Sequence, residues 1–186
     1  MNIANLITIL RVVLVPVIVW ALMSDQMMVA FFVFVAAGVS DAVDGALARH
    51  LNQQTEFGTM LDPIADKIML VSVYILLAYL GHVPLWLTIL IVSRDMLIVF
   101  GILLAYALDK VVTIKPLWIS KANTLAQIVL AAFTLGILAF KLEWPMVMLA
   151  LVWITAILTT LSAMAYMRDG LKLFATSESD EQVDKV

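Results

Sequence analysis

Four aspartates lie close together in a chain that is otherwise strongly apolar. Asp41 and Asp44 are three residues apart, and Asp62 and Asp66 are four residues apart. On a helix, either spacing places both carboxylates on one face. A short connection between two such helices makes them antiparallel neighbours, so we expect the four carboxylates to converge on one place.

Carboxylates inside a membrane need water or a counter-charge, because each acid costs about 2.5–3.5 kcal/mol at the centre of a bilayer. A divalent cation supplies that charge, and ligands that are all oxygen favour Mg²⁺, Mn²⁺ or Ca²⁺. The chain has no cysteine, and its two histidines, His50 and His82, are far apart. Zinc or iron–sulfur sites built on these residue types are therefore not expected.

Two other interpretations of these residues stay open at this point. The acids could line a path for protons or cations instead of holding a metal. Gly45, Ala48 and Gly58 either let a bulky ligand approach the helix backbone or simply pack helices together. Arg49 either neutralises a phosphate or pairs with one of the acids.

The composition places the chain among integral membrane proteins. Of 186 residues, 64% are hydrophobic and 13% are charged, and the mean hydropathy is +1.07. Because a span needs about 20 apolar residues, six spans are predicted. They cover residues 3–23, 27–49, 58–80, 84–108, 120–140 and 145–167.

These spans predict an all-α bundle of six transmembrane helices in a single domain, residues 1–174, followed by an acidic and disordered tail, residues 175–186. The first run is interrupted by Arg11, so we expect a retained span rather than a secretory signal. Positive residues gather on one side of the predicted bundle, which places both termini and the four aspartates in the cytoplasm. These residues are Arg49, Lys110, Lys115, Lys121, Arg168 and Lys172, against Lys141 alone on the other side.

The stretches DAVDGALAR and GTMLDPIAD resemble the signature of the CDP-alcohol phosphotransferase family, DxxDGxxAR followed by GxxxDxxxD. A pattern with this many fixed positions in one short segment is specific. The fixed positions are Asp41, Asp44, Gly45, Ala48, Arg49, Gly58, Asp62 and Asp66.

The resemblance implies an enzyme that moves a substituted phosphate from a CDP-linked donor to an alcohol and releases CMP. It implies that Asp41, Asp44, Asp62 and Asp66 hold one or two Mg²⁺ or Mn²⁺ ions, and that Asp66 is also the general base. Gly45, Ala48 and Gly58 would make room for the cytidine, and Arg49 would contact phosphate. The family also implies a homodimer, and no nucleic-acid partner is expected.

The first span, NLITILR, also resembles the family's first span. Asn5 and Thr8 would border the nucleotide pocket, with Arg11 near a phosphate. The alternative is that Asn5 and Thr8 form interfacial hydrogen bonds and that Arg11 reaches toward the membrane surface.

Two acceptor alcohols compete within the family. Members that use glycerol 3-phosphate resemble AREFxxxxLR and GKxKT, whereas this chain reads SRDMLIVFGIL and ISKANT. Arg94 and Lys121 are kept, but Ile102 and Asn123 stand where two further cations are expected. The loss of two charge-assisted contacts, each worth about 1.5–3 kcal/mol, disfavours a phosphate monoester.

The segments ISRD and IKPLWISKANT instead resemble members that make cardiolipin. Arg94, Lys115 and Lys121 would then approach the phosphate of the lipid acceptor, or form an ordinary basic rim, with Asp95 paired to Arg94. We therefore expect transfer from CDP-diacylglycerol to phosphatidylglycerol at the cytoplasmic face of a bacterial inner membrane. Glycerol 3-phosphate as acceptor and a cation or proton transporter are the alternatives.

Overall fold

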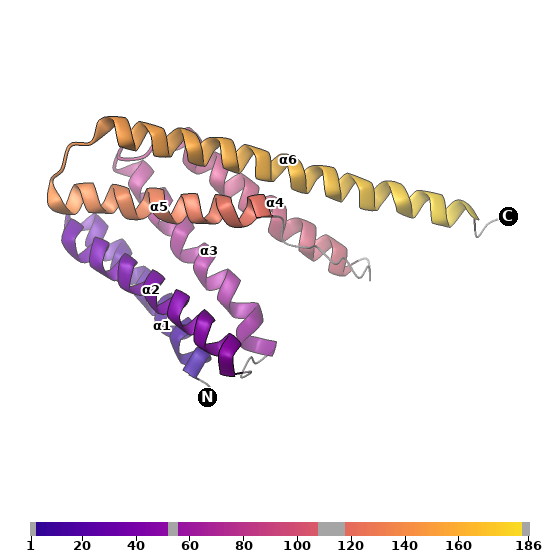
Figure 1. Cartoon of the computed structure of the whole chain (residues 1–186), viewed down its shortest axis with the longest axis horizontal. Coiled ribbons are helices and arrows are strands. Elements are labelled where there is room, and N and C mark those ends of the chain that lie inside the picture. The colour runs from indigo at the N-terminus through magenta and orange to yellow at the C-terminus, as the bar shows by residue number, and fades with distance from the viewer. Residues whose placement is uncertain (1–2, 52–55, 108–117, 184–186) are drawn as a thin grey trace.

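The computed structural model is built from six α-helices (Figure 1). It describes the backbone of residues 3–51, 56–107 and 118–183, and the side chains of residues 12–40, 67–100 and 118–168. No strand occurs within these ranges. The helices are α1 (Ile3–Met23), α2 (Met27–Leu51), α3 (Glu56–Tyr79), α4 (Leu85–Ala107), α5 (Trp118–Phe140) and α6 (Pro145–Val183).

The predicted all-α fold with six helices is confirmed. Each predicted apolar run corresponds to one helix, and the bounds agree to within two residues everywhere except at the end of the last helix. There the backbone of α6 continues to Val183, past the point at which the sequence predicts that the domain ends. The division between domain and tail stays a prediction.

Three short turns join the helices in pairs. Asp25, Gly81 and Lys141 each have a positive φ, of 58°, 80° and 53°, which is the conformation that commonly ends a helix. Figure 1 shows these turns at the end of the molecule away from both termini. In each turn a backbone N–H donates to the carbonyl five residues earlier: Gln26 to Ala21 at 2.8 Å, His82 to Leu77 at 2.8 Å and Leu142 to Ile137 at 2.9 Å.

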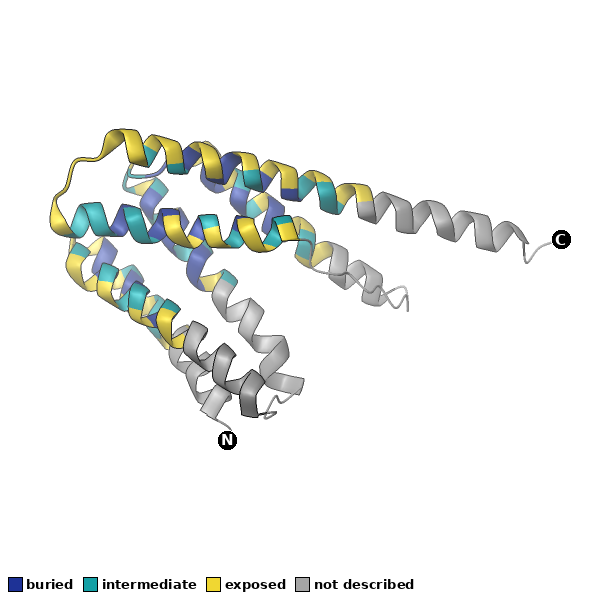
Figure 2. Cartoon of the chain, in the orientation of Figure 1, coloured by how far each residue is buried: buried dark blue, intermediate teal, exposed yellow. Residues whose placement is uncertain are grey.

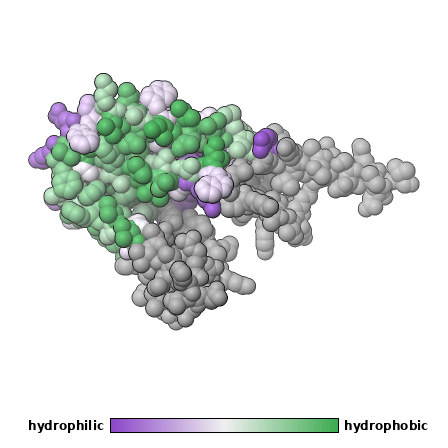
Figure 3. Space-filling view, viewed as in Figure 1, coloured by the Kyte–Doolittle hydropathy of each residue, from purple (hydrophilic) through white to green (hydrophobic). Residues whose placement is uncertain are grey.

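The last two helices bury polar residues and expose apolar ones. On α6, Thr155 and Thr159 are fully buried, whereas Trp153 and Ile157 are more than half exposed. The exposed turns of α5 and α6 in Figure 2 coincide with a largely hydrophobic surface in Figure 3. This is the reverse of a soluble protein, and it suits a helix pair surrounded by lipid.

By length and composition, two helical segments of the described residues are able to cross a membrane. They are Trp118–Phe140 and Pro145–Arg168. Shorter apolar helical segments are found at Val12–Met23, Met27–Ser40 and Lys67–Tyr79. The described residues thus support a membrane location most directly through α5 and α6.

The first helix lies at the centre of the packing of α1, α2 and α3. Among the described contacts, α1 packs against both α2 and α3, whereas none joins α2 directly to α3. Ile18, Ala21 and Leu22 of α1 are at most 1% exposed, so they fill the space in this group of helices. The turns at which the second and third helices are expected to meet, residues 41–51 and 56–66, lie outside the described side chains, so their direct contact stays a prediction.

Candidate active site

The signature lies at the ends of two helices. Its first five fixed positions fall on the last turns of α2 and its other three on the first turns of α3. Their side chains are outside the described residues, as are those of Asn5, Thr8 and Arg11 on α1, and Lys115 lies outside the described backbone. The eight fixed positions of the signature are Asp41, Asp44, Gly45, Ala48, Arg49, Gly58, Asp62 and Asp66.

The backbone brings the signature's helix ends to one region. The first turns of α1, the last turns of α2 and the first turns of α3 lie at the end of the molecule opposite the short turns (Figure 1). Four aspartates at helical spacing lie on these turns, and carboxylate oxygens are ligands that suit a hard divalent ion such as Mg²⁺ or Mn²⁺. In the part of the chain with described side chains, no other group of acids or histidines is suited to a metal.

Next to the signature, a buried ion-pair network joins α3 to α4. Lys67, which follows Asp66 directly, donates from Nζ to both carboxylate oxygens of Asp95 at 2.8 and 2.7 Å. Arg94 donates from Nη1 to Asp95 Oδ1 at 2.7 Å. The side chain of Asp95 is 3% exposed and that of Lys67 is 29% exposed. The three charges sum to +1, since two cations share one carboxylate.

Arg94 extends this network to α5 and α6. Its Nη2 donates to Ser120 Oγ at 2.6 Å and to Ser162 Oγ at 2.7 Å, and its Nε donates to Ser162 Oγ at 3.1 Å. The guanidinium carbon lies 5.6 Å from the centre of the Tyr166 ring, within the range of a cation–π contact. Because a guanidinium has five N–H donors, these bonds and the one to Asp95 leave a single N–H of Arg94 for any ligand.

A ladder of polar residues continues from Arg94 between α5 and α6. Asn123 Oδ1 lies 2.7 Å from Thr159 Oγ1, and Thr134 Oγ1 lies 3.5 Å from Met148 Sδ. Moving forward along α5 by a number of residues corresponds to moving back along α6 by the same number, as antiparallel packing requires. This register places Gln127 opposite Thr155.

Several polar atoms of the ladder have no hydrogen-bond partner among the described protein groups. They are Asn123 Nδ2, Gln127 Nε2, Gln127 Oε1 and Thr155 Oγ1. The backbone carbonyl of Gln127, by contrast, accepts a hydrogen bond from Tyr74 Oη at 2.8 Å. The ladder therefore combines hydrogen-bonded positions with two side chains, Gln127 and Thr155, whose polar atoms have no partner among the described groups.

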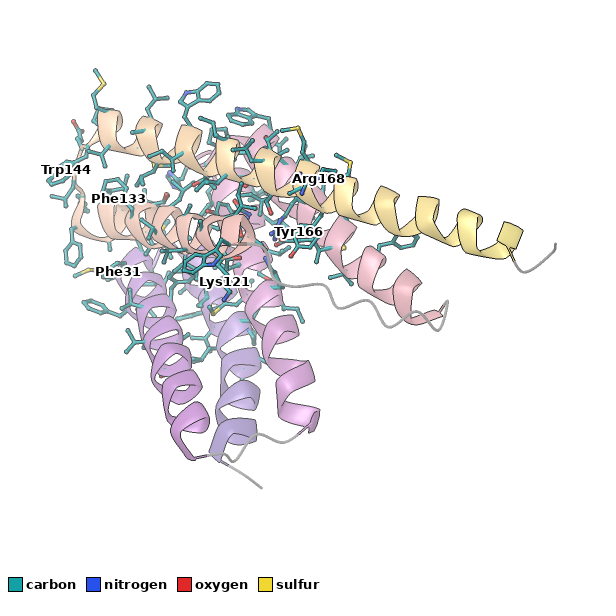
Figure 4. The ribbon with its side chains drawn as sticks, turned by 45° about the vertical axis from the view of Figure 1, so that its right-hand side comes forward. Phe31, Lys121, Phe133, Trp144, Tyr166 and Arg168 are labelled. Carbon is teal, nitrogen blue, oxygen red and sulfur yellow. The ribbon has the colours of Figure 1, made fainter. Side chains whose placement is uncertain are left out.

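The predicted acceptor residues with described side chains differ in their surroundings. Arg94 is buried and paired with Asp95, which is the pairing that the sequence offers as an alternative. Lys121 is exposed in the first turn of α5, with Nζ 5.9 Å from the centre of the Trp118 ring. Figure 4 shows Lys121 toward the same end as Tyr166 and Arg168. Of Arg94 and Lys121, Lys121 is the cation with the clearer access to an anionic head group.

Lys67 and the serines were missed by sequence reasoning. Ser120 and Ser162 carry no signal beyond ordinary polarity. Lys67 does carry one, since it is a lysine directly after the signature and at the head of an apolar stretch, Lys67–Tyr79. A charge in that position needs a counter-charge, but nothing local to it indicates Asp95, 28 residues away.

The comparison with protein families decides the assignment. Residues 1–161 match the model of the CDP-alcohol phosphatidyltransferase family. The chain belongs to this family. As a CDP-alcohol phosphatidyltransferase it is an enzyme, which argues against the transporter alternative.

Individual relatives of this CDP-alcohol phosphatidyltransferase differ in their acceptors, as their names indicate. A probable phosphatidylglycerophosphate synthase of Mycobacterium tuberculosis is 35% identical, covering 92% of this chain and 82% of that protein. The cardiolipin synthase (CMP-forming) of Rattus norvegicus is 34% identical, covering 92% and 62%. The CDP-diacylglycerol–glycerol-3-phosphate 3-phosphatidyltransferase of Blochmanniella floridana is 35% identical, covering 89% and 88%. The chain is thus a phospholipid-synthesising transferase, and overall identity does not select the acceptor.

Proposed function

We propose that the enzyme transfers the phosphatidyl group of CDP-diacylglycerol to a hydroxyl of phosphatidylglycerol, giving cardiolipin and CMP. The observation that carries the choice of acceptor is that protein groups already bond most of the N–H donors of Arg94. With a carboxylate and two hydroxyls already bonded, this guanidinium keeps one N–H for a ligand. A phosphate monoester, close to two negative charges, needs more cations than an acceptor with one phosphodiester charge.

The proposed reaction is a displacement at the phosphorus that carries the diacylglycerol. The acceptor hydroxyl oxygen forms a new P–O bond, the phosphoanhydride P–O bond breaks, and CMP leaves with the electron pair. Asp66 takes the proton of the hydroxyl. Gly45, Ala48 and Gly58 leave space for the cytidine, and Arg49, Asn5 and Thr8 bind the donor.

Asp41, Asp44, Asp62 and Asp66 would hold one or two Mg²⁺ or Mn²⁺ ions. When bound, such an ion neutralises charge on the diphosphate and on the transferring phosphoryl group. On the acceptor side, Arg11, Lys115 and Lys121 approach the phosphate, with Arg94 contributing its one remaining N–H. Lys121 supports this assignment because its side chain is exposed in the first turn of α5, the turn of that helix nearest to Lys115 in the sequence.

A second candidate acceptor is glycerol 3-phosphate, which would give phosphatidylglycerophosphate. The similarity to the Mycobacterium tuberculosis and Blochmanniella floridana proteins favours it. The buried network adds one argument in favour of glycerol 3-phosphate. The net charge of +1 on Lys67, Arg94 and Asp95 lies next to the signature and would attract an anionic substrate.

For the whole chain we propose six transmembrane spans, both termini in the cytoplasm, and a homodimer. The inner membrane of a bacterium is the proposed location. The support is the apolar outer surface of α5 and α6 and the sorting of basic residues in the sequence. In this orientation the short turns at Asp25, Gly81 and Lys141 face away from the cytoplasm.

One assay separates the two acceptors. Purified protein in phospholipid vesicles is supplied with Mg²⁺, CDP-diacylglycerol labelled in its acyl chains, and either phosphatidylglycerol or glycerol 3-phosphate. We expect labelled cardiolipin with phosphatidylglycerol, together with one CMP per product. Labelled phosphatidylglycerophosphate from glycerol 3-phosphate alone would reject the first proposal in favour of the second, and no product with either acceptor would reject both.

A further inference from the structure

Lys67 is the one described residue that joins the signature directly to the buried network. It follows Asp66 in the sequence, and its ammonium lies 2.7–2.8 Å from both carboxylate oxygens of Asp95 on α4. Its side chain keeps 29% exposure while Asp95 keeps 3%. The ammonium therefore reaches from a partly accessible position on α3 into a buried carboxylate.

A lysine beside a cluster of carboxylates is a chemical problem for the proposed function. The ammonium is a compact charge on a flexible four-carbon stem, and it forms strong charge-assisted hydrogen bonds to any carboxylate within reach. The nearest carboxylate along the chain belongs to Asp66. Neighbouring residues of a helix do not face each other, but an ammonium on so long a stem, if it is not held elsewhere, would bring a positive charge close to the divalent ion that the proposed function needs there.

We propose that Asp95 is a positioning residue that holds Lys67 against α4 and so keeps its ammonium away from the carboxylates of the signature. This inference rests on the proposed function. Arg94 fixes Asp95 for this task, because it bonds Asp95 Oδ1 and is itself anchored to Ser120 and Ser162. Asp95 is thus held in place by a partner other than Lys67.

A set of three variants separates this role from a purely structural tie between α3 and α4. Asp95→Asn keeps the shape and a hydrogen-bond acceptor for Arg94 but removes the negative charge, and one of the two oxygens, that hold Lys67. Lys67→Met removes the ammonium and leaves the Arg94–Asp95 pair intact. The double variant lacks the tie altogether and also lacks the cation. Asp25→Asn with Lys141→Met, both in exposed turns, is the matched control.

Two readouts are measured on the purified full-length protein: binding of Mn²⁺ alone, by electron paramagnetic resonance, and CMP release. We expect Asp95→Asn to weaken Mn²⁺ binding by at least about tenfold, because a nearby positive charge opposes a divalent ion. Lys67→Met should stay within about threefold of the wild type, and the double variant should recover most of what Asp95→Asn loses.

Rescue in the double variant is the decisive result. If Asp95 only ties two helices together, Lys67→Met should be as impaired as Asp95→Asn, and the double variant should be no better than either. That pattern would overturn the inference. Failure of the proposed function would give a different result: the wild type would release no CMP, whatever the variants do to Mn²⁺ binding.

Discussion

At the scale of single residues, Arg94 has the most partners in the described part of the site. Its guanidinium bonds side chains on three helices, at Asp95 beside it on α4, at Ser120 on α5 and at Ser162 on α6. A buried cation with this many hydrogen bonds is costly to disturb, because each partner loses its bond without gaining water.

We therefore expect Arg94→Met to lower the free energy of unfolding by about 3 kcal/mol or more, the range for breaking one side of a buried ion pair. Arg94→Lys should recover only part of this loss, since an ammonium lacks the planar fork that reaches both serines. Denaturation followed in detergent micelles measures the effect, with Lys141→Met as an exposed control. Equal stability of Arg94→Met and the control would contradict the assigned network.

Residue by residue, the site was predictable where its signal is local. The signature is a local pattern in the sequence, and so is the adjacency that suggests an Arg94–Asp95 pair, which the structure contains. The Lys67–Asp95 pair was not predictable, because it depends on how α3 and α4 are placed relative to each other. The roles assigned to the signature side chains stay predictions.

At the scale of elements, the α5–α6 pair shows how a membrane helix interface uses polar groups. Its outer face is apolar, and its inner face carries a register of polar pairs in which Asn123 meets Thr159. Gln127, fully buried, has no partner for its side-chain amide among the described protein groups. Unpaired amide groups are unfavourable in such surroundings.

Gln127→Leu should accordingly leave stability unchanged or raise it by about 1 kcal/mol, since it replaces unpaired polar atoms with an apolar side chain of similar size. Thr159→Val, one turn away, is the matched comparison. It leaves the buried Asn123 Oδ1 without its hydrogen-bond partner and should destabilise by about 1–3 kcal/mol. Thermal denaturation of both variants in the same detergent gives the comparison. A large loss of stability in Gln127→Leu would show that its amide has partners beyond those described.

The helices themselves were predictable because each is an apolar run of the length that a span requires. Their packing was not. The sequence gives no sign that α1 packs against both α2 and α3, as it does in the described contacts. Periodicity identifies a helix and its apolar faces, but neighbours are decided by which side chains fit together.

At the scale of the whole molecule, the proposed orientation can be tested with single cysteines, because the chain has none of its own. We expect Lys141→Cys, in the α5–α6 turn, to react with a membrane-impermeant maleimide in intact cells. Lys121→Cys, toward the other end of α5, should be protected in cells and react in inverted membrane vesicles. The opposite pattern would reverse the topology and place the signature outside the cytoplasm.

The most direct test of the account is CMP release by Asp66→Asn, compared with the wild type and with Asp25→Asn, in vesicles containing CDP-diacylglycerol, phosphatidylglycerol and Mg²⁺. Asn is similar in size to Asp but cannot accept the hydroxyl proton, so release should fall by about 10²–10⁴-fold, while binding of CDP-diacylglycerol persists. Turnover by Asp66→Asn at the wild-type rate would contradict the claim that the signature acids perform this transfer.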